Sequence, residues 1–217
     1  MVEKEVDTSA LTLSHEEIFR TMGVPEGAMD ELSISLVEEV LPELMKTAKP
    51  RYAYMYVDSV DFKYGRIIRE GLKDAERYAV VVSTVGPEAD ALLHHYQEVD
   101  MIKAFTGDAI ATEMAEAVQR VALEAVESEM LEGERISNPY SPGYCGWMLK
   151  EQTKLFGLFE KAPCDVELTD SCLMIPIKSI SSVLAIGQKV VKAPYGCAVC
   201  GKMDCYKKRK NDLHKKI

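Results

Sequence analysis

The cysteines near the C-terminus have the spacing of metal ligands. Cys197 and Cys200 form a C-x-x-C pair, and Cys205 follows five residues later. Two thiolates at this spacing can meet on one metal ion, and clustered cysteines in a chain without an export signal are more often ligands than disulfide partners. The candidates for a fourth ligand are Cys145 and Cys172.

The spacing of the cysteines does not identify the metal. Zinc would make the cluster a structural clamp, whereas an iron–sulfur cluster would make it an electron relay. Free or redox-regulated thiols are the alternative to any metal. Cys164 stands apart from the cluster, and we expect it to be a small buried residue.

A second candidate for chemistry is the turn Ser141-Pro-Gly-Tyr144. Pro142 fixes its φ angle and Gly143 has no side chain, so backbone N–H and C=O groups of the turn can approach a ligand. Tyr144 adds a hydroxyl and an aromatic face, which is worth roughly 0.5 to 2 kcal/mol to a cation. An isolated Pro-Gly is more often an ordinary turn, so this motif alone does not establish a site.

Several common catalytic motifs are absent from the sequence. It contains no G-x-G-x-x-G after a predicted strand, no G-x-x-x-x-G-K-S/T and no H-E-x-x-H. His94 and His95 are adjacent on a predicted helix and cannot face one site together. These observations argue against the simplest dinucleotide, nucleoside triphosphate and zinc-protease functions.

The elements that must position these residues mix helices and strands without a regular βαβ alternation. The sequence therefore predicts an α+β fold, a single compact domain with a central, mainly antiparallel sheet and flanking helices. The hydrophobic periodicity and the turn residues predict helices over 14–23, 30–49, 88–97, 101–132 and 147–159, and strands over 51–57, 78–85, 166–168, 172–177 and 182–191.

Two of these helices have predicted packing faces. The helix over 14–23 instead has a predicted start at Ser14, whose S-x-x-E spacing to Glu17 is that of a capping box. The helix over 30–49 is expected to bury one stripe, and the helix over 101–132 has small residues that let another backbone approach. The stripe of the helix over 30–49 comprises Leu32, Leu36, Val40, Leu44 and Ala48. The stripe of the helix over 101–132 comprises Gly107, Ala111, Ala115, Val118 and Ala122.

Charge divides the chain into two parts. From Lys202 to Ile217 there are seven Lys or Arg against two Asp, so this tail carries +5 and the rest −14 of the net −9. We therefore expect residues 1–192 to form the domain and 193–217 a basic cysteine-containing tail that docks on a protein or on its own body, rather than a nucleic-acid-binding surface. The sequence has no apolar run of about 20 residues and no secretory signal, which favours the cytoplasm over a membrane.

Two ordered elements resemble a known family. Residues 140–147, Tyr-Ser-Pro-Gly-Tyr-Cys-Gly-Trp, are similar to an S/A-P-G-Y element, and residues 168–179, Leu-Thr-Asp-Ser-Cys-Leu-Met-Ile-Pro-Ile-Lys-Ser, to an L-T-E-S-x-x-M-x-P-x-x-S element. These two family elements are found in the activation domain of cobalamin-dependent methionine synthase, which this chain therefore resembles. The resemblance extends over about residues 14–190.

This resemblance implies a role in corrinoid reactivation. In the family, S-adenosylmethionine binds over the corrinoid, an electron reduces inactive cob(II)alamin, and methyl transfer from the sulfonium traps the product. The chain has no D-x-H-x-x-G corrinoid-ligand motif, so the corrinoid would be held by a partner, a methionine synthase or another corrinoid methyltransferase, with an electron-donor protein possible. The implied ligand residues are Ser141, Pro142, Gly143, Tyr144, Thr169 and Ser171, with Glu113 or Glu116 for the amino group of the ligand.

The sequence also departs from the family. Pro139 stands where the family has a ligand-binding arginine, Arg135 lies four residues further back, and Leu184 replaces a family tyrosine. These changes leave a second hypothesis, a non-catalytic metal-binding module that docks on a corrinoid protein. Binding of S-adenosylmethionine distinguishes the two.

Overall fold

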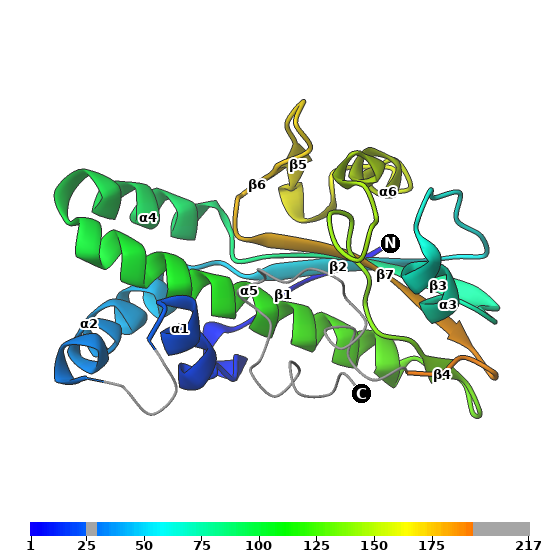
Figure 1. The fold of residues 1–217 in the computed structure, drawn as a ribbon, viewed down its shortest axis with the longest axis horizontal. Helices are drawn as coiled ribbons and strands as arrows, with labels where there is room; N and C mark the ends of the chain where they lie inside the picture. Colours follow the sequence, from blue (N-terminus) through cyan, green and yellow to red (C-terminus); the bar gives the residue numbers. More distant parts are fainter. Residues whose placement is uncertain (25–29, 193–217) are drawn as a thin grey trace.

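The computed structural model describes residues 1–24 and 30–192. A five-stranded antiparallel sheet in the order β1-β2-β3-β7-β4 forms its centre (Figure 1). A hairpin of two short strands, β5 and β6, stands apart from this sheet. The strands are β1 (Val2–Glu5), β2 (Arg51–Val57), β3 (Arg77–Thr84), β4 (Arg135–Ile136), β5 (Glu167–Leu168), β6 (Met174–Ile175) and β7 (Ser179–Gly187).

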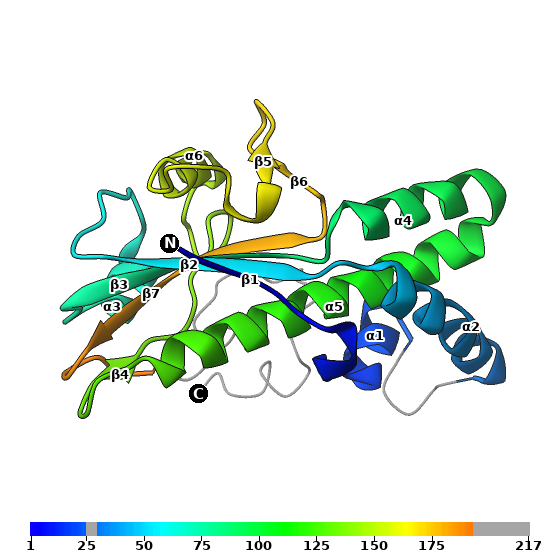
Figure 2. The same ribbon diagram turned by 180° about the vertical axis from the view of Figure 1, so that it is seen from behind.

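Helices cover both faces of the sheet. The longest, α5 (Met101–Ser128), crosses one face, with α1 (His15–Thr21), α2 (Glu31–Thr47) and α4 (Pro87–Val99) packed against it (Figure 2). On the other face lie α3 (Arg66–Gly71), α6 (Gln152–Phe156) and the β5–β6 hairpin. The 3-10 turns are η1 (Thr8–Ala10), η2 (Leu149–Glu151) and η3 (Pro163–Asp165). The predicted α+β fold is confirmed.

The alternation of side chains along β3 creates two hydrophobic cores. Ala79 and Val81 pack with the α5 layer, whereas Val80 and Val82 pack with Trp147 and the other layer. Successive side chains of a strand point to opposite faces, so a strand buried on both sides reads as a continuous apolar run. This is why residues 78–85 could be recognised as a buried strand.

Close approach of three helices depends on Gly107. A Cβ atom at this position would lie 2.8 Å from Cδ2 of Leu93 on α4 and 3.5 Å from Cγ1 of Val40 on α2. The predicted small-residue stripe of α5 is therefore a packing surface. The predicted stripe of α2 is wrong at its first position, because Leu32 is 69 % exposed, while Val37 is buried beside Val40 and Leu44.

Other departures from the predicted elements are local. The helix expected over 147–159 is only η2 followed by α6. Strand β1, a charged edge strand, and the six-residue helix α3 were not predicted, because neither is long enough to show a periodic pattern. None of the described helices is long and apolar enough to cross a bilayer.

Candidate functional site

The Ser141–Tyr144 turn begins at the edge of β7. Tyr140 and Val183 exchange both backbone hydrogen bonds, at 3.0 and 2.9 Å, and the chain then leaves the sheet. Gly143 donates its N–H to the carbonyl of Trp147 at 2.8 Å and has φ of +91°, a left-handed conformation that favours glycine. The predicted turn is therefore fixed by backbone contacts at both ends.

Trp147 anchors this turn in the core. Its side chain is 2 % exposed, and its ring lies 5.1 Å from that of Phe62 and 6.1 Å from that of Tyr64, measured between centroids. Large aromatic side chains bury 150–250 Å² each, so this contact holds the turn against the sheet. The side chain of Tyr144, by contrast, is 55 % exposed, which leaves its ring available to a ligand.

The second sequence element forms the turn between β5 and β6. The N–H of Thr169 donates to the carbonyl of Leu173 at 2.9 Å, and the N–H of Leu173 donates to Oγ1 of Thr169 at 3.0 Å. Oγ1 also lies 3.0 Å from Oγ of Ser171. The Thr169 hydroxyl thus closes its own turn, a structural role that its sequence motif does not predict.

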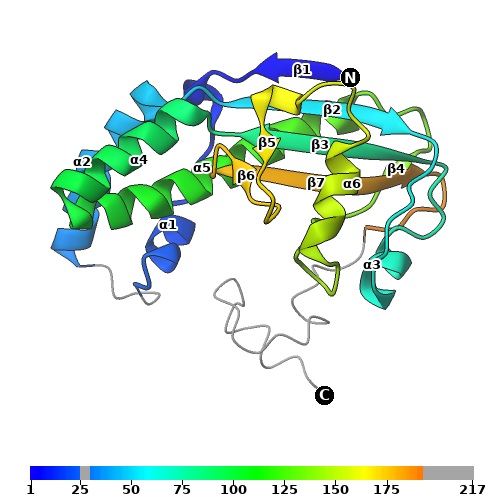
Figure 3. The ribbon, with the colours of Figure 1, turned by 90° about the horizontal axis from the view of Figure 1, so that it is seen from above.

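Gln152 joins the two sequence elements. This residue of α6 is 2 % exposed; its Nε2 donates to the carbonyl of Cys172 at 3.0 Å, and its Oε1 accepts from Oγ of Ser181 on β7 at 3.3 Å. The Ser141–Tyr144 turn, which leads into α6, and the Thr169–Leu173 turn therefore lie on one side of the sheet (Figure 3). Gln152 was not among the predicted site residues, although it lies in the segment that resembles the family.

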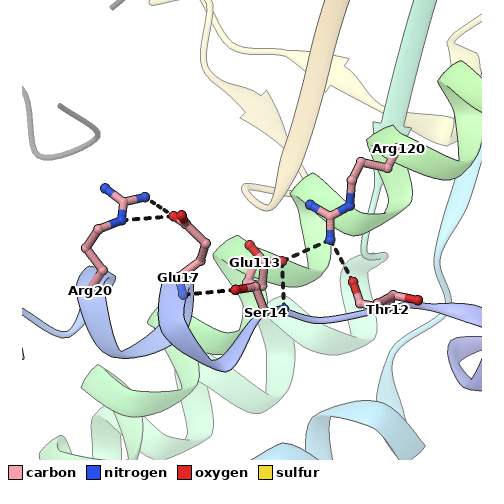
Figure 4. A network of polar contacts seen from close by, with 6 residues as sticks. All are labelled: Thr12, Ser14, Glu17, Arg20, Glu113 and Arg120. Carbon is pink, nitrogen blue, oxygen red and sulfur yellow. Dashed lines mark hydrogen bonds and ion pairs between the residues drawn. The ribbon is translucent and has the colours of Figure 1, made fainter. Parts of the chain in front are cut away.

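The carboxylates proposed for the ligand amino group lie on α5, across the sheet from α6 and the hairpin (Figure 1). Glu113 is 5 % exposed, and its Oε1 accepts from the N–H of Ser14 at 3.1 Å and from Arg120 at 2.9 Å (Figure 4). Arg120 also donates to the carbonyl of Thr12 at 2.7 Å. Glu113 therefore fastens the N-terminal segment to α5. Glu116, one turn further along, is half-buried.

A second buried amide holds β7 from the α5 side. Nε2 of Gln119 donates to Oγ of Ser182 at 2.6 Å, and its Oε1 accepts from Oγ of Ser83 on β3 at 2.9 Å. Because Ser181 and Ser182 are consecutive, β7 is held by one glutamine on each face. This arrangement fixes α5, α6 and the hairpin relative to one strand.

The proposed metal ligands are only partly within the described residues. Cys145 and Cys172 are half-buried, with φ of 51° and 63°, and Sγ of Cys172 is 3.5 Å from Oγ1 of Thr153. The three remaining ligands, Cys197, Cys200 and Cys205, lie outside the described residues. Within 1–24 and 30–192, no group of three or more His, Cys, Asp or Glu could hold a metal ion.

Arg135 does not take the place of the family arginine at the Ser141–Tyr144 turn. Arg135 opposes Gly187, four residues along β7 from Val183, so about 13 Å of strand separates the two pairs. Leu184 is 1 % exposed and packs in the core on the α5 side. Arg135 instead lines a surface pocket of about 390 Å³ with Met130, Ile136 and Val190.

Comparison with known proteins identifies the family. The model of the family described as "Vitamin B12 dependent methionine synthase, activation domain" matches residues 66–211, about two thirds of the chain. The chain belongs to this family. The family match includes both sequence elements of the candidate site.

A solved structure supports the same fold. The chain is similar to the crystal structure of the MetH reactivation domain bound to AdoHcy, with a TM-score of 0.64 and 19 % sequence identity. The similarity covers 89 % of this chain and 80 % of the other. A comparison with curated proteins finds no match.

Proposed function

We propose that this activation-domain protein binds S-adenosylmethionine and assists the reductive methylation of a corrinoid held by a partner, a methionine synthase or another corrinoid methyltransferase. The observation that carries the proposal is the Trp147-anchored turn, which presents Tyr144 outward in a chain of this family. The AdoHcy bound to the similar MetH reactivation domain adds support.

The residues of the turn fit such a ligand. Gly143 leaves the outer side of the turn open, since a Cβ atom there would meet only Cδ1 of Leu149, at 3.6 Å. An exposed aromatic ring beside it can stabilise a sulfonium cation through its π face. S-adenosylmethionine would supply the methyl group, and the protein would bind and orient it.

Calorimetric titration with S-adenosylmethionine and AdoHcy tests this function. We expect both to bind, and Tyr144→Leu to weaken S-adenosylmethionine binding by about 2- to 30-fold, the equivalent of the cation–π energy. Leu32→Ala serves as the control, because Leu32 is also an exposed apolar side chain but lies on α2. A wild-type protein that binds neither compound would rule out the proposal.

The cysteine cluster is a separate part of the proposal. We propose that Cys197, Cys200 and Cys205 bind zinc or an iron–sulfur cluster, completed by Cys145 or Cys172. Metal analysis and a visible spectrum of anaerobically purified protein distinguish these possibilities, because an iron–sulfur protein is coloured and a zinc protein is not. Cys145→Ser and Cys172→Ser identify the fourth ligand by loss of bound metal.

The alternative function is a non-catalytic docking module for a corrinoid protein. Its supporting observation is that Glu113 is occupied by Ser14 and Arg120, and that Pro139 replaces the family arginine. Such a module would bind a corrinoid protein with the same affinity whether S-adenosylmethionine is present or absent. A pull-down with purified corrinoid protein, with and without S-adenosylmethionine, separates the two functions.

A further inference from the structure

Gln152 is a buried polar residue whose side-chain hydrogen bonds lead to the hairpin and to β7. Its side chain is 2 % exposed, and it stands at the start of α6, shortly after the Ser141–Tyr144 turn. An unpaired amide at such a buried position would cost several kcal/mol in an apolar environment. The partners of Gln152 therefore determine where α6 can lie.

Each hydrogen bond of Gln152 fixes one neighbouring element. Nε2 meets the carbonyl of Cys172 at 3.0 Å, and this carbonyl belongs to the Thr169–Leu173 turn. Oε1 accepts from Oγ of Ser181 at 3.3 Å, on the strand that pairs with Tyr140 two residues further along. The strands β5 and β6 pair with each other and not with the five-stranded sheet, so the hairpin depends on contacts of this kind for its orientation.

We propose that Gln152 is a positioning residue that sets the Thr169–Leu173 turn against the Ser141–Tyr144 turn, so that both face one ligand. The inference rests on the proposed S-adenosylmethionine binding. Gln152 does not touch the ligand; it acts through the carbonyl of Cys172. The bond to Ser181 holds α6 on the sheet, and the bond to Cys172 holds the hairpin on α6.

Three variants separate positioning from general stability. Gln152→Met keeps a similar volume and removes both hydrogen bonds. Ser181→Ala removes only the bond to β7 and leaves the donor to the Cys172 carbonyl. Ser83→Ala is the matched control, because Ser83 is equally buried and loses one hydrogen bond to a glutamine, Gln119, on the other face of the sheet.

The first measurement is the dissociation constant of AdoHcy, compared with urea unfolding of the same variants. We expect Gln152→Met to weaken binding about tenfold, the effect of one lost hydrogen bond, and Ser181→Ala and Ser83→Ala to change it less than about twofold. An unchanged affinity in Gln152→Met would overturn the inference. So would a loss of affinity that follows the loss of stability in all three variants.

The second measurement is hydrogen exchange of the Cys172 and Leu173 amides, which needs no ligand. Both amides donate within the Thr169–Leu173 turn, and we expect faster exchange in Gln152→Met and near wild-type exchange in Ser83→Ala. If wild-type protein fails to bind AdoHcy, the proposed function falls, and the exchange result alone decides whether Gln152 positions the hairpin. Unchanged exchange in Gln152→Met would remove the positioning role.

Discussion

Gly71, the last residue of α3, makes room for Tyr140 at the start of the candidate turn. A Cβ atom at position 71 would lie 1.9 Å from the hydroxyl oxygen of Tyr140 and 2.2 Å from its Cζ. The backbone of Tyr140 is fixed by its pairing with Val183, and its side chain packs against the core on this side of the sheet, so the ring would have to shift within that packing. A single methyl group would therefore act on the turn through Tyr140.

We expect Gly71→Ala to destabilise the protein by about 1–3 kcal/mol, the usual effect of overpacking. Urea unfolding measures this change. In a Tyr140→Leu background the same substitution should cost much less, because the clashing ring is gone. Equal costs in both backgrounds would show that the contact with Tyr140 is not the cause.

Glu129, at the end of α5, fastens this helix to β2. The hydroxyl of Tyr54 donates to Oε1 of Glu129 at 2.5 Å, and that of Tyr56 donates to Oε2 at 3.0 Å. These hydrogen bonds, that of Tyr54 first, lower the pKa of Glu129 below its usual value of 4.5. Since Tyr54 is fully buried and bonds to a charged group, we expect Tyr54→Phe to cost about 1.5–3 kcal/mol.

A lowered carboxyl pKa gives this contact a defined pH dependence. The stability that it contributes is fully present above about pH 4.5, the unfolded value, and is lost as pH falls through the folded pKa. Urea unfolding at a series of pH values should show the difference between wild type and Glu129→Gln shrinking as pH drops from about 7 to about 3. A difference independent of pH would contradict the assignment.

The N-terminal segment is held to α5 by Glu113, and this contact changes the expected helix cap. Oγ of Ser14 accepts from the N–H of Glu17 at 3.3 Å, as the capping box predicts. The N–H of Ser14, however, donates to Glu113, while Glu17 pairs with Arg20. A distant carboxylate has taken the place that the local motif assigns to Glu17.

We expect Glu113→Ala to cost about 1–3 kcal/mol, because it leaves the half-buried N–H of Ser14 and the guanidinium of Arg120 without this acceptor. Glu113→Gln retains an acceptor oxygen and should cost less. Urea unfolding measures both, and hydrogen exchange of residues 14–21 shows whether α1 loosens. A larger effect of Glu113→Gln than of Glu113→Ala would be inconsistent with this role.

The sequence allowed the long elements to be predicted, but few of the contacts between them. Strand β2 and helix α5 were found because aromatic and small residues repeat with the period of a strand or helix, and Ser14 because its cap is local. The pairing of Gln152 with Cys172 and of Glu113 with Ser14 joins residues far apart in the chain. No spacing rule reports such pairs, so the family resemblance located the two turns while the structure was needed to join them.

At the scale of the whole molecule, the reactivity of Cys164 shows whether solvent reaches the core between the sheet and η3. Its side chain is fully buried, and burial raises the pKa of its thiol to about 12. Cys145 and Cys172 are half-buried on the same side of the sheet. The described part of the chain thus contains one protected cysteine and two that solvent reaches.

In protein freed of metal with a chelator, alkylation with iodoacetamide at about pH 8 should therefore modify Cys145 and Cys172 in the folded state but spare Cys164, since the thiolate is the reactive form. In urea all three should react. Peptide mass analysis assigns each site. Rapid modification of Cys164 in the folded protein would show that this core opens without global unfolding.

Gln119 and Gln152, which form hydrogen bonds to β7 from opposite faces, also specify how this strand aligns with β3. Ser181 lies opposite Val82 and Ser182 opposite Val81, with one hydroxyl on each face of the sheet. A slip by a single residue in either direction would place Ile180 or Val183 against one of the amides, and that amide would lose its hydrogen bond to β7. The two adjacent serines therefore allow both amides to be paired in only one register of the strand that borders the candidate site.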